Sequence, residues 1–214
     1  MALSKVNFNS LNVTPAASKA IKFNSNNNGI ETGDVGGSLV LLETKTASSD
    51  GTLSFTSNID STYKEYIFKC IDIHPGNDDV RFTFQADTGT NTNYNQTITS
   101  TNFAANHGED GNNGALAYDS GEDQAQATAF HRLVGSVGND NDQCCAGILH
   151  IFDPSSTTFV KHFIARFQEI RNNNSSKEHF TAGYFNTTTA ITRFQFKMSD
   201  GNIDAGTIKL YGVS

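Results

Sequence analysis

The chain has 214 residues and a formal net charge of −7, with 16 Phe and 6 Tyr but no Trp. Only 17% of its residues are charged, while Asn, Thr, Ser and Gly are abundant. The absence of any Lys/Arg run argues against nucleic acid as a partner. Because disordered chains are poor in aromatic residues, the Phe content argues against disorder. The composition instead indicates short strands joined by many turns.

The first 36 residues show weak periodicity, and Asn24–Gly33 is typical of turns and loops. We therefore expect an extended N-terminal arm over residues 1–36 and one folded domain over residues 37–214. The N-terminus lacks the apolar core of a signal peptide. No stretch approaches the ~18 apolar residues that would predict a membrane span. These features predict no membrane insertion.

Strand patterns begin at Ser38 and continue to the C-terminus. In Tyr63–Ile73 the side chains of Tyr66, Phe68 and Cys70 share one parity, as expected for a strand with period two. Residues 87–125 are polar and rich in Gly, so we expect one or two weak strands and long loops there. The remaining predicted strands are Ser38–Lys45, Thr52–Thr56, Val80–Gln85, Ala127–Val134, Cys145–Phe152, Thr158–Phe167, Phe180–Phe185, Ile191–Met198 and Thr207–Tyr211.

About ten or eleven short strands separated by Asn- and Gly-rich turns predict an all-β fold. We expect an antiparallel β-sandwich that is jelly-roll-like. Two segments are candidates for a helical turn, Ala16–Phe23 and Gln124–Leu133.

The segment Phe159–Phe167 reads FVKHFIARF, and its two faces can be separated by parity. Phe159, Lys161, Phe163, Ala165 and Phe167 fall on one face, while Val160, His162, Ile164 and Arg166 fall on the other. A short helix is the alternative, because the Phe residues are four apart. We favour a strand, since β-branched and aromatic residues dominate, and we place it centrally because both faces contain apolar groups.

The three cysteines are Cys70, Cys144 and Cys145. An odd number with two adjacent members is not a disulfide framework. Cys144 and Cys145 also lack the spaced partners of a zinc site. We expect buried, reduced thiols and, from them, synthesis in a reducing cytoplasm.

The sequence contains no recognisable catalytic motif, so we predict no catalytic residue and no cofactor. The nucleophile motif G-x-S-x-G is absent, as are H-x-x-x-H and H-x-H among the six histidines. The carboxylate pairs Asp78–Asp79, Glu109–Asp110 and Glu122–Asp123 lie in predicted loops. His150 and His162 would face each other across adjacent strands if the segment between them were a hairpin connection.

The segment Gly138–Gln143 reads GNDNDQ and resembles part of a calcium loop. Asp140 and Asp142 are the candidate ligands, because oxygen atoms at alternate positions suit a hard cation. The turn Gly and the late Glu of such a loop are missing, and Cys144 and Cys145 occupy positions five and six counted from Asp140. A plain turn is therefore the favoured interpretation.

The C-terminal half contains three runs that resemble a known group of proteins. They are GILHIFDPSSTTFVKHF from Gly147, AGYFN from Ala182, and SDGNIDAGTIKLYGV from Ser199. These runs resemble the C-terminal β-module of virion structural proteins from marine tailed bacteriophages, and upstream pieces extend the resemblance over most of residues 29–214. This sequence has Asp153 where that group commonly has Asn, and Asp200 where Ser is common. The matching runs contain no catalytic residues of that group, so the resemblance assigns no catalytic residue to this chain.

The resemblance implies a non-enzymatic structural protein on the surface of a virion. We expect a capsid decoration protein or a tail-fibre or adsorption component, anchored by its N-terminal arm to other virion proteins. By analogy with phage proteins of both kinds, a homo-oligomer is expected, most simply a trimer, with a host surface glycan as a further partner. The alternative is a jelly-roll carbohydrate-binding module, and an enzyme with a dispersed site is the third hypothesis.

Overall fold

The computed structural model describes residues 19–24, 26, 28–34, 39–112 and 114–214. The chain divides into two compact units, residues 1–38 and residues 39–214. In the first unit, β1 (Lys19–Phe23) and β2 (Ile30–Asp34) form an antiparallel two-stranded sheet. Residues 1–18, 25, 27, 35 and 36 of the predicted arm lie outside the described residues.

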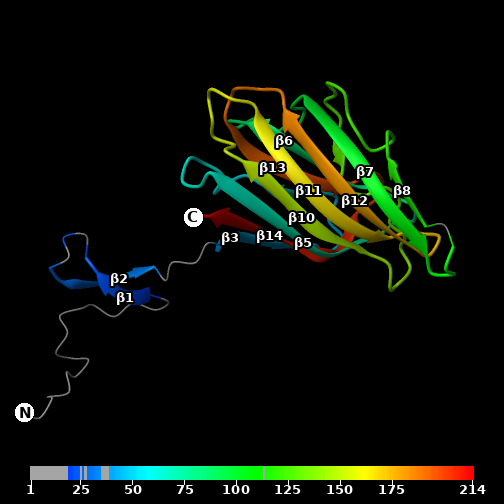
Figure 1. Cartoon of the computed structure of the whole chain (residues 1–214), viewed down its shortest axis with the longest axis horizontal. Coiled ribbons are helices and arrows are strands. Elements are labelled where there is room, and N and C mark those ends of the chain that lie inside the picture. Colours follow the sequence, from blue (N-terminus) through cyan, green and yellow to red (C-terminus); the bar gives the residue numbers. More distant parts are fainter. Residues whose placement is uncertain (1–18, 25, 27, 35–38, 113) are drawn as a thin grey trace, which may run out of the picture. The chain divides into compact units, whose positions relative to one another are not determined.

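The second unit consists of two antiparallel sheets that share one core (Figure 1). The large sheet has the order β3-β14-β5-β10-β11-β12-β7-β8, and the small sheet has the order β4-β13-β6-β9. The large-sheet strands are β3 (Leu39–Thr46), β5 (Glu65–Pro75), β7 (Ile98–Gly108), β8 (Ala115–Tyr118), β10 (Cys145–Phe152), β11 (Lys161–Ile170), β12 (Ser175–Phe185) and β14 (Ile203–Val213). The small-sheet strands are β4 (Leu53–Phe55), β6 (Phe82–Thr88), β9 (His131–Arg132) and β13 (Ile191–Met198).

Phenylalanine rings fill the space between the two sheets. Nine of the Phe side chains in the described part of the chain are almost completely buried: Phe55, Phe68, Phe82, Phe84, Phe163, Phe167, Phe185, Phe194 and Phe196. Rings from the two layers meet directly, with Phe68 and Phe196 at a centroid distance of 5.1 Å and Phe84 and Phe163 at 5.3 Å. Tilted and edge-to-face contacts of this kind add to the hydrophobic gain from burial.

The last strand of the chain is not an edge strand. β14 pairs with β3 on one side and with β5 on the other, so the large sheet is completed only when the C-terminal segment is in place. Its pairing with β5 shifts register near Ala205 and Thr207. Gly206 lies at this irregularity with a φ of 119°, a backbone angle that a residue with a side chain adopts only at a cost.

The prediction of an all-β antiparallel sandwich is confirmed, since every regular element within the described residues is a strand. The bounds predicted for β10 and β13 match the observed ones. The helical turn suggested for Gln124–Leu133 is wrong, because that segment is irregular apart from β9. Of the strand predicted for Ala127–Val134, only His131–Arg132 (β9) is a strand in the structure. In the other candidate, Ala16–Phe23, the described residues from Lys19 form β1 and not a helix.

The region 87–125 contains the two strands expected there, but β7 is not weak. It spans eleven residues and pairs along its whole length with β12. Its inward side chains include Ser100 and Asn102, which are polar yet buried. A hydrogen bond from Asn102 Nδ2 to Thr181 Oγ1 at 2.6 Å compensates for part of this burial, while Asn102 Oδ1 is buried without a partner among the described residues.

Replacing Gly206 with Ala should strongly destabilise the sandwich. A Cβ atom at this position would lie 2.6 Å from the Asp72 carbonyl oxygen and 2.8 Å from Ile73 Cα, and the positive φ adds backbone strain. We expect the free energy of unfolding to fall by at least about 2 kcal/mol in urea denaturation. Gly89→Ala is the matched control, because Gly89 also has a positive φ but has no atom within 4 Å of that Cβ position. Equal losses in the two variants would contradict the role of β14 packing.

Candidate functional site

Along strand β11 the side chains point alternately into the core and toward the solvent. Phe163 and Phe167 are buried, and His162, Ile164 and Arg166 are exposed. The structure thus confirms that this segment is a central strand and that its two faces divide as predicted. Phe159 is the exception, because it precedes the strand and exposes 70% of its surface. The outward side chains belong to the face of the large sheet opposite the core, which we call the outer face.

The register of the sheet places the outward residues of three strands in rows. His162 on β11 is opposite Tyr184 on β12, and Tyr184 is opposite Thr99 on β7. The centroids of the His162 and Tyr184 rings are 6.1 Å apart. In the next row, Ile164 is opposite Ala182. The small side chain of Ala182 leaves a depression between its larger neighbours.

Two neighbouring hollows lie at the end of the outer face where β11 begins. The first has a volume of about 440 Å³ and is lined by Thr99, Ser100, Thr101, Phe152, His162, Phe163, Ile164, Ala182, Gly183 and Tyr184. The second has a volume of about 660 Å³ and is lined by Phe152, Asp153, Ser156, Thr158, Phe159, Val160, His162 and Thr188. Both hollows are lined by Phe152 and His162, so they are adjacent, and we call the two together the ring groove. Each volume falls within the range of ligand sites.

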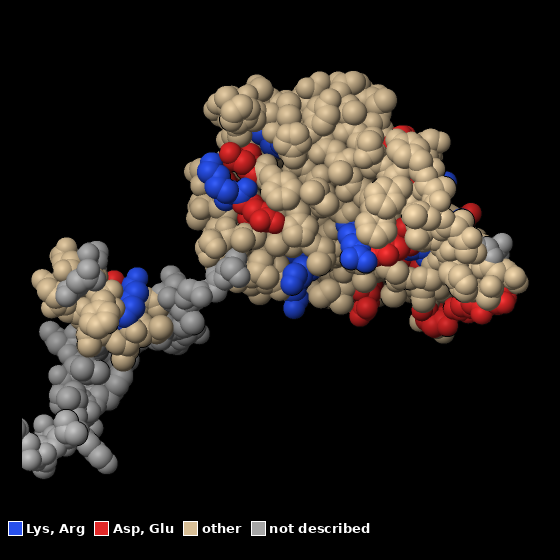
Figure 2. Space-filling view, viewed as in Figure 1, with Lys and Arg blue, Asp and Glu red and all other residues tan. Residues whose placement is uncertain are grey.

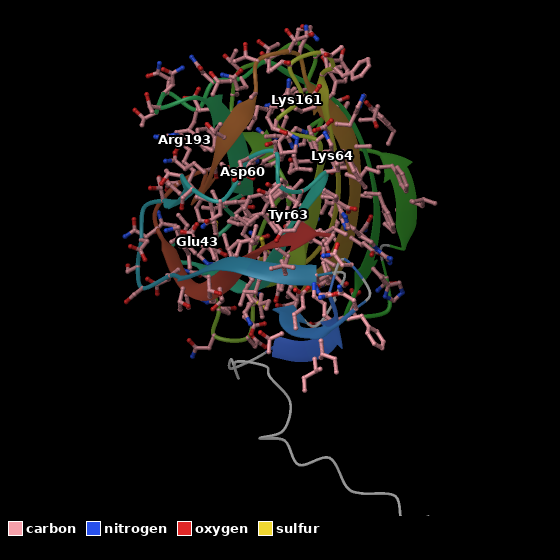
Figure 3. The ribbon with its side chains drawn as sticks, turned by 90° about the vertical axis from the view of Figure 1, so that its left-hand side faces the viewer. Glu43, Asp60, Tyr63, Lys64, Lys161 and Arg193 are labelled. Atoms are coloured by element: carbon pink, nitrogen blue, oxygen red, sulfur yellow. The ribbon has the colours of Figure 1, made fainter. Side chains whose placement is uncertain are left out.

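The loops beside the ring groove are fastened by Lys161, the first residue of β11. Its side chain is completely buried, and Nζ donates hydrogen bonds to the carbonyl oxygens of Phe159 at 3.0 Å and Thr187 at 3.1 Å. Burial lowers the pKa of Lys161, since the charged form loses hydration. The ammonium thus links the β10–β11 connection to the β12–β13 connection. Figure 3 shows Lys161 and Lys64 at the same end of the sandwich.

His150 also lies on the outer face, but it is not opposite His162. Strands β10 and β11 pair as an antiparallel hairpin, as the suggested contact required, and His150 is opposite Ile164. Its Nδ1 is 2.6 Å from Glu65 Oε1, so its ring is held toward β5. The predicted contact between His150 and His162 is therefore wrong, although both side chains lie on the outer face.

The suggested calcium ligands Asp140 and Asp142 lie in the turn between Val137 and β10. Within this turn, Gln143 N donates to the Asp140 carbonyl oxygen at 2.9 Å, and that oxygen also lies 3.2 Å from His74 Nε2. Among the residues that the structure describes, no three His, Cys, Asp or Glu side chains are grouped so that they could hold a metal ion.

The cysteines are free thiols. Cys70 and Cys145 are buried as expected, whereas Cys144 is only half-buried. Burial raises the pKa of Cys70 and of Cys145 well above the ordinary value for a thiol. A thiol in this state contains little thiolate and is a poor nucleophile.

The structure also reveals a buried Ser–His pair that the sequence did not indicate. Ser100 Oγ is 2.7 Å from His131 Nε2, and His131 Nδ1 is 2.7 Å from the Arg132 carbonyl oxygen. If His131 Nδ1 donates to that carbonyl, Ser100 donates to Nε2, which resembles an activated serine. However, Ser100 exposes only 7% of its surface and His131 none, so the pair lies within the core. Its evident role is to satisfy polar groups of β7 and β9.

A second buried polar cluster surrounds Glu169 on β11. Its Oε2 accepts hydrogen bonds from the backbone N–H groups of Gly135 and Ser136 at 3.0 and 2.9 Å, and its Oε1 is 3.2 Å from His179 Nε2. Glu122 also lies close to Gly135, since a Cβ atom at Gly135 would be 3.1 Å from Glu122 Oε1 and 3.6 Å from Glu169 Oε1, and burial raises the pKa of Glu122. These groups fasten the long connection between β8 and β10 to the inner face of the large sheet.

The comparisons with known proteins provide no family for this chain: no protein-family model, curated protein or solved structure gives a significant match. No helix in the described ranges is both long and apolar enough to cross a membrane.

The buried His131 predicts a stability that falls in mild acid. Burial lowers the pKa of His131 to about 4, whereas an exposed imidazole titrates near 6.5. Between these two values the unfolded chain binds more protons, so the free energy of unfolding must decrease as the pH falls. We expect a loss on the order of 3 kcal/mol from this group between pH 7 and pH 4.

The variant His131→Gln isolates the contribution of His131 to the pH dependence of stability, because a Gln side chain does not titrate. The variant should be less stable than the wild type at pH 7, but it should lose less stability on acidification. Urea denaturation of both proteins at several pH values measures the difference. Parallel pH profiles for the two proteins would contradict the assignment.

Proposed function

We propose that this chain is a non-enzymatic structural protein on the surface of a virus particle, anchored through its N-terminal unit. The observation that supports anchoring is the β1–β2 hairpin. Its apolar side chains Ile21, Phe23 and Ile30 expose 48%, 74% and 41% of their surfaces. An isolated two-stranded hairpin is at best marginally stable in water. Contact with another protein would cover these side chains and stabilise the hairpin.

The virion assignment is based on the resemblance of the C-terminal runs to structural proteins of marine tailed phages. Capsid decoration and tail-fibre or adsorption roles are both compatible with an anchored β-sandwich. We further propose association into a homo-oligomer, for which a trimer is the simplest analogy. Strand β3 at one edge of the large sheet supports this, because Leu39, Val40 and Leu41 are exposed there.

Carbohydrate binding is the second candidate function, and the ring groove favours it. Saccharides are commonly bound by aromatic rings that face their C–H groups and by polar groups that bind their hydroxyls. The ring groove combines Phe, Tyr and His rings with several Thr hydroxyls on an open surface. The two functions are compatible, since a virion surface protein can bind a host glycan.

The anchoring proposal predicts that polar substitutions in the hairpin will prevent incorporation into particles. We expect the double variant Ile21→Ser/Phe23→Ser to be incorporated at least tenfold less than the wild type, because the anchor loses its apolar contact. The measurement is the number of copies per purified particle after assembly with the other virion proteins. Leu116→Ser is the matched control, since Leu116 exposes 70% of its surface but lies on β8. Normal incorporation of the hairpin variant would refute anchoring through β1–β2.

A further inference from the structure

The ring groove has almost no charge available for a ligand. Neither hollow is lined by Lys or Arg, and the single carboxylate among the lining residues belongs to Asp153. Asp153 Oδ1 is 3.0 Å from Lys64 Nζ, so this carboxylate is already paired. Figure 2 shows mostly uncharged surface over the upper part of the viewed face. A strongly anionic or cationic ligand would thus find no charged partner in the groove.

Aromatic rings are present at both ends of the ring groove. Phe159 lines the second hollow and exposes 70% of its surface, so a ligand that covers its ring would remove apolar area from water. Tyr184 lines the first hollow and contacts the ring of His162. His162 borders both hollows, and its imidazole can donate or accept a hydrogen bond.

Hydroxyl groups accompany these rings along the groove. Thr101 in the first hollow and Thr158 and Thr188 in the second are exposed. Each threonine hydroxyl is one donor and an acceptor, which suits a partner that contains many hydroxyls of its own. The combination of uncharged rings and hydroxyls is selective for a ligand with apolar C–H faces and a polar, uncharged periphery.

The groove is bordered by loops that are held by hydrogen bonds and by closely packed strands. Lys161 fixes the two loops on either side of it through the Phe159 and Thr187 carbonyl oxygens. On its floor, a Cβ at Gly183 would lie 2.6 Å from Phe163 Cζ and 2.7 Å from the Thr99 carbonyl oxygen, so the backbone there is packed closely against its neighbours. A preformed site binds with a smaller entropic cost.

The position of the groove argues against a peptide ligand that binds by adding a strand to the sheet. β11 and β12 pair with neighbours on both sides, so their backbone groups are already used and an extended peptide has no free edge to join. We propose that the ring groove binds an uncharged saccharide chain, with Tyr184 and Phe159 stacking on separate sugar units and His162 hydrogen-bonding between them. This inference rests on the second proposed function and specifies its ligand class and its contacts.

Isothermal titration of the full chain with defined hexasaccharides tests the proposal. The probes are cellohexaose, xylohexaose, mannohexaose and chitohexaose, with hexagalacturonate as an acidic comparator. We expect the wild type to bind at least one neutral probe more tightly than the acidic one. Tyr184→Ala and Phe159→Ala should each weaken that binding about tenfold, which corresponds to about 1.4 kcal/mol and is near the upper value for one aromatic contact.

Tyr118→Ala is the matched control, because Tyr118 exposes 57% of its surface on β8 and does not line the groove. This variant should bind as the wild type does, and circular dichroism with thermal unfolding should show that all three variants are folded. Equal weakening in Tyr118→Ala and Tyr184→Ala would overturn the location. Binding of hexagalacturonate alone would overturn the ligand class while leaving carbohydrate binding standing. Binding of none of the five probes would overturn the inference together with the second function, and it would leave the anchoring proposal unaffected.

Discussion

The packing of phenylalanine rings between the two sheets is the constraint on which the rest of the structure depends. Phe196 on β13 contacts rings from β4, β5 and β6, including Phe68 across the layers and Phe82 beside it. Because side chains alternate along a strand, each ring that points into this core forces its neighbours outward. A shift of one residue in register would place His162 in the core and Phe163 in water, so the core also determines the composition of the outer face.

The proposed functions follow from what this constraint leaves at the surface. The inner face of the large sheet is filled, and its outer face retains the aromatic and hydroxyl groups that form the ring groove. Lys161 connects the two regions, since it is buried at the start of β11 while its ammonium holds the loops that border the groove. The hairpin β1–β2 presents a different surface with exposed apolar side chains. Anchoring and ligand binding would thus use separate parts of the chain.

Hydrophobic periodicity predicted the elements whose inward side chains are apolar. Cys145–Phe152 and Ile191–Met198 have this property, and their predicted bounds match β10 and β13. β7 was underestimated because two polar side chains, Ser100 and Asn102, are buried there. They form hydrogen bonds with His131 and Thr181, which are distant in sequence. Parity also predicted that His162, Ile164 and Arg166 share one face of β11, but it did not indicate which face points outward. The ring groove could not be predicted, because it depends on the β11–β12–β7 register and on loops fixed by tertiary hydrogen bonds.

The most direct test of the central claim is a map of ligand contacts on the isotopically labelled chain. Backbone amide shifts would be recorded by NMR during titration with whichever neutral hexasaccharide binds. The account predicts that the largest changes fall on Phe159, His162 and Tyr184 and on their neighbours in β11, β12 and β7. Changes concentrated instead at the opposite end of the large sheet, around the hollow lined by Glu109, Arg171 and Asn174, would contradict it.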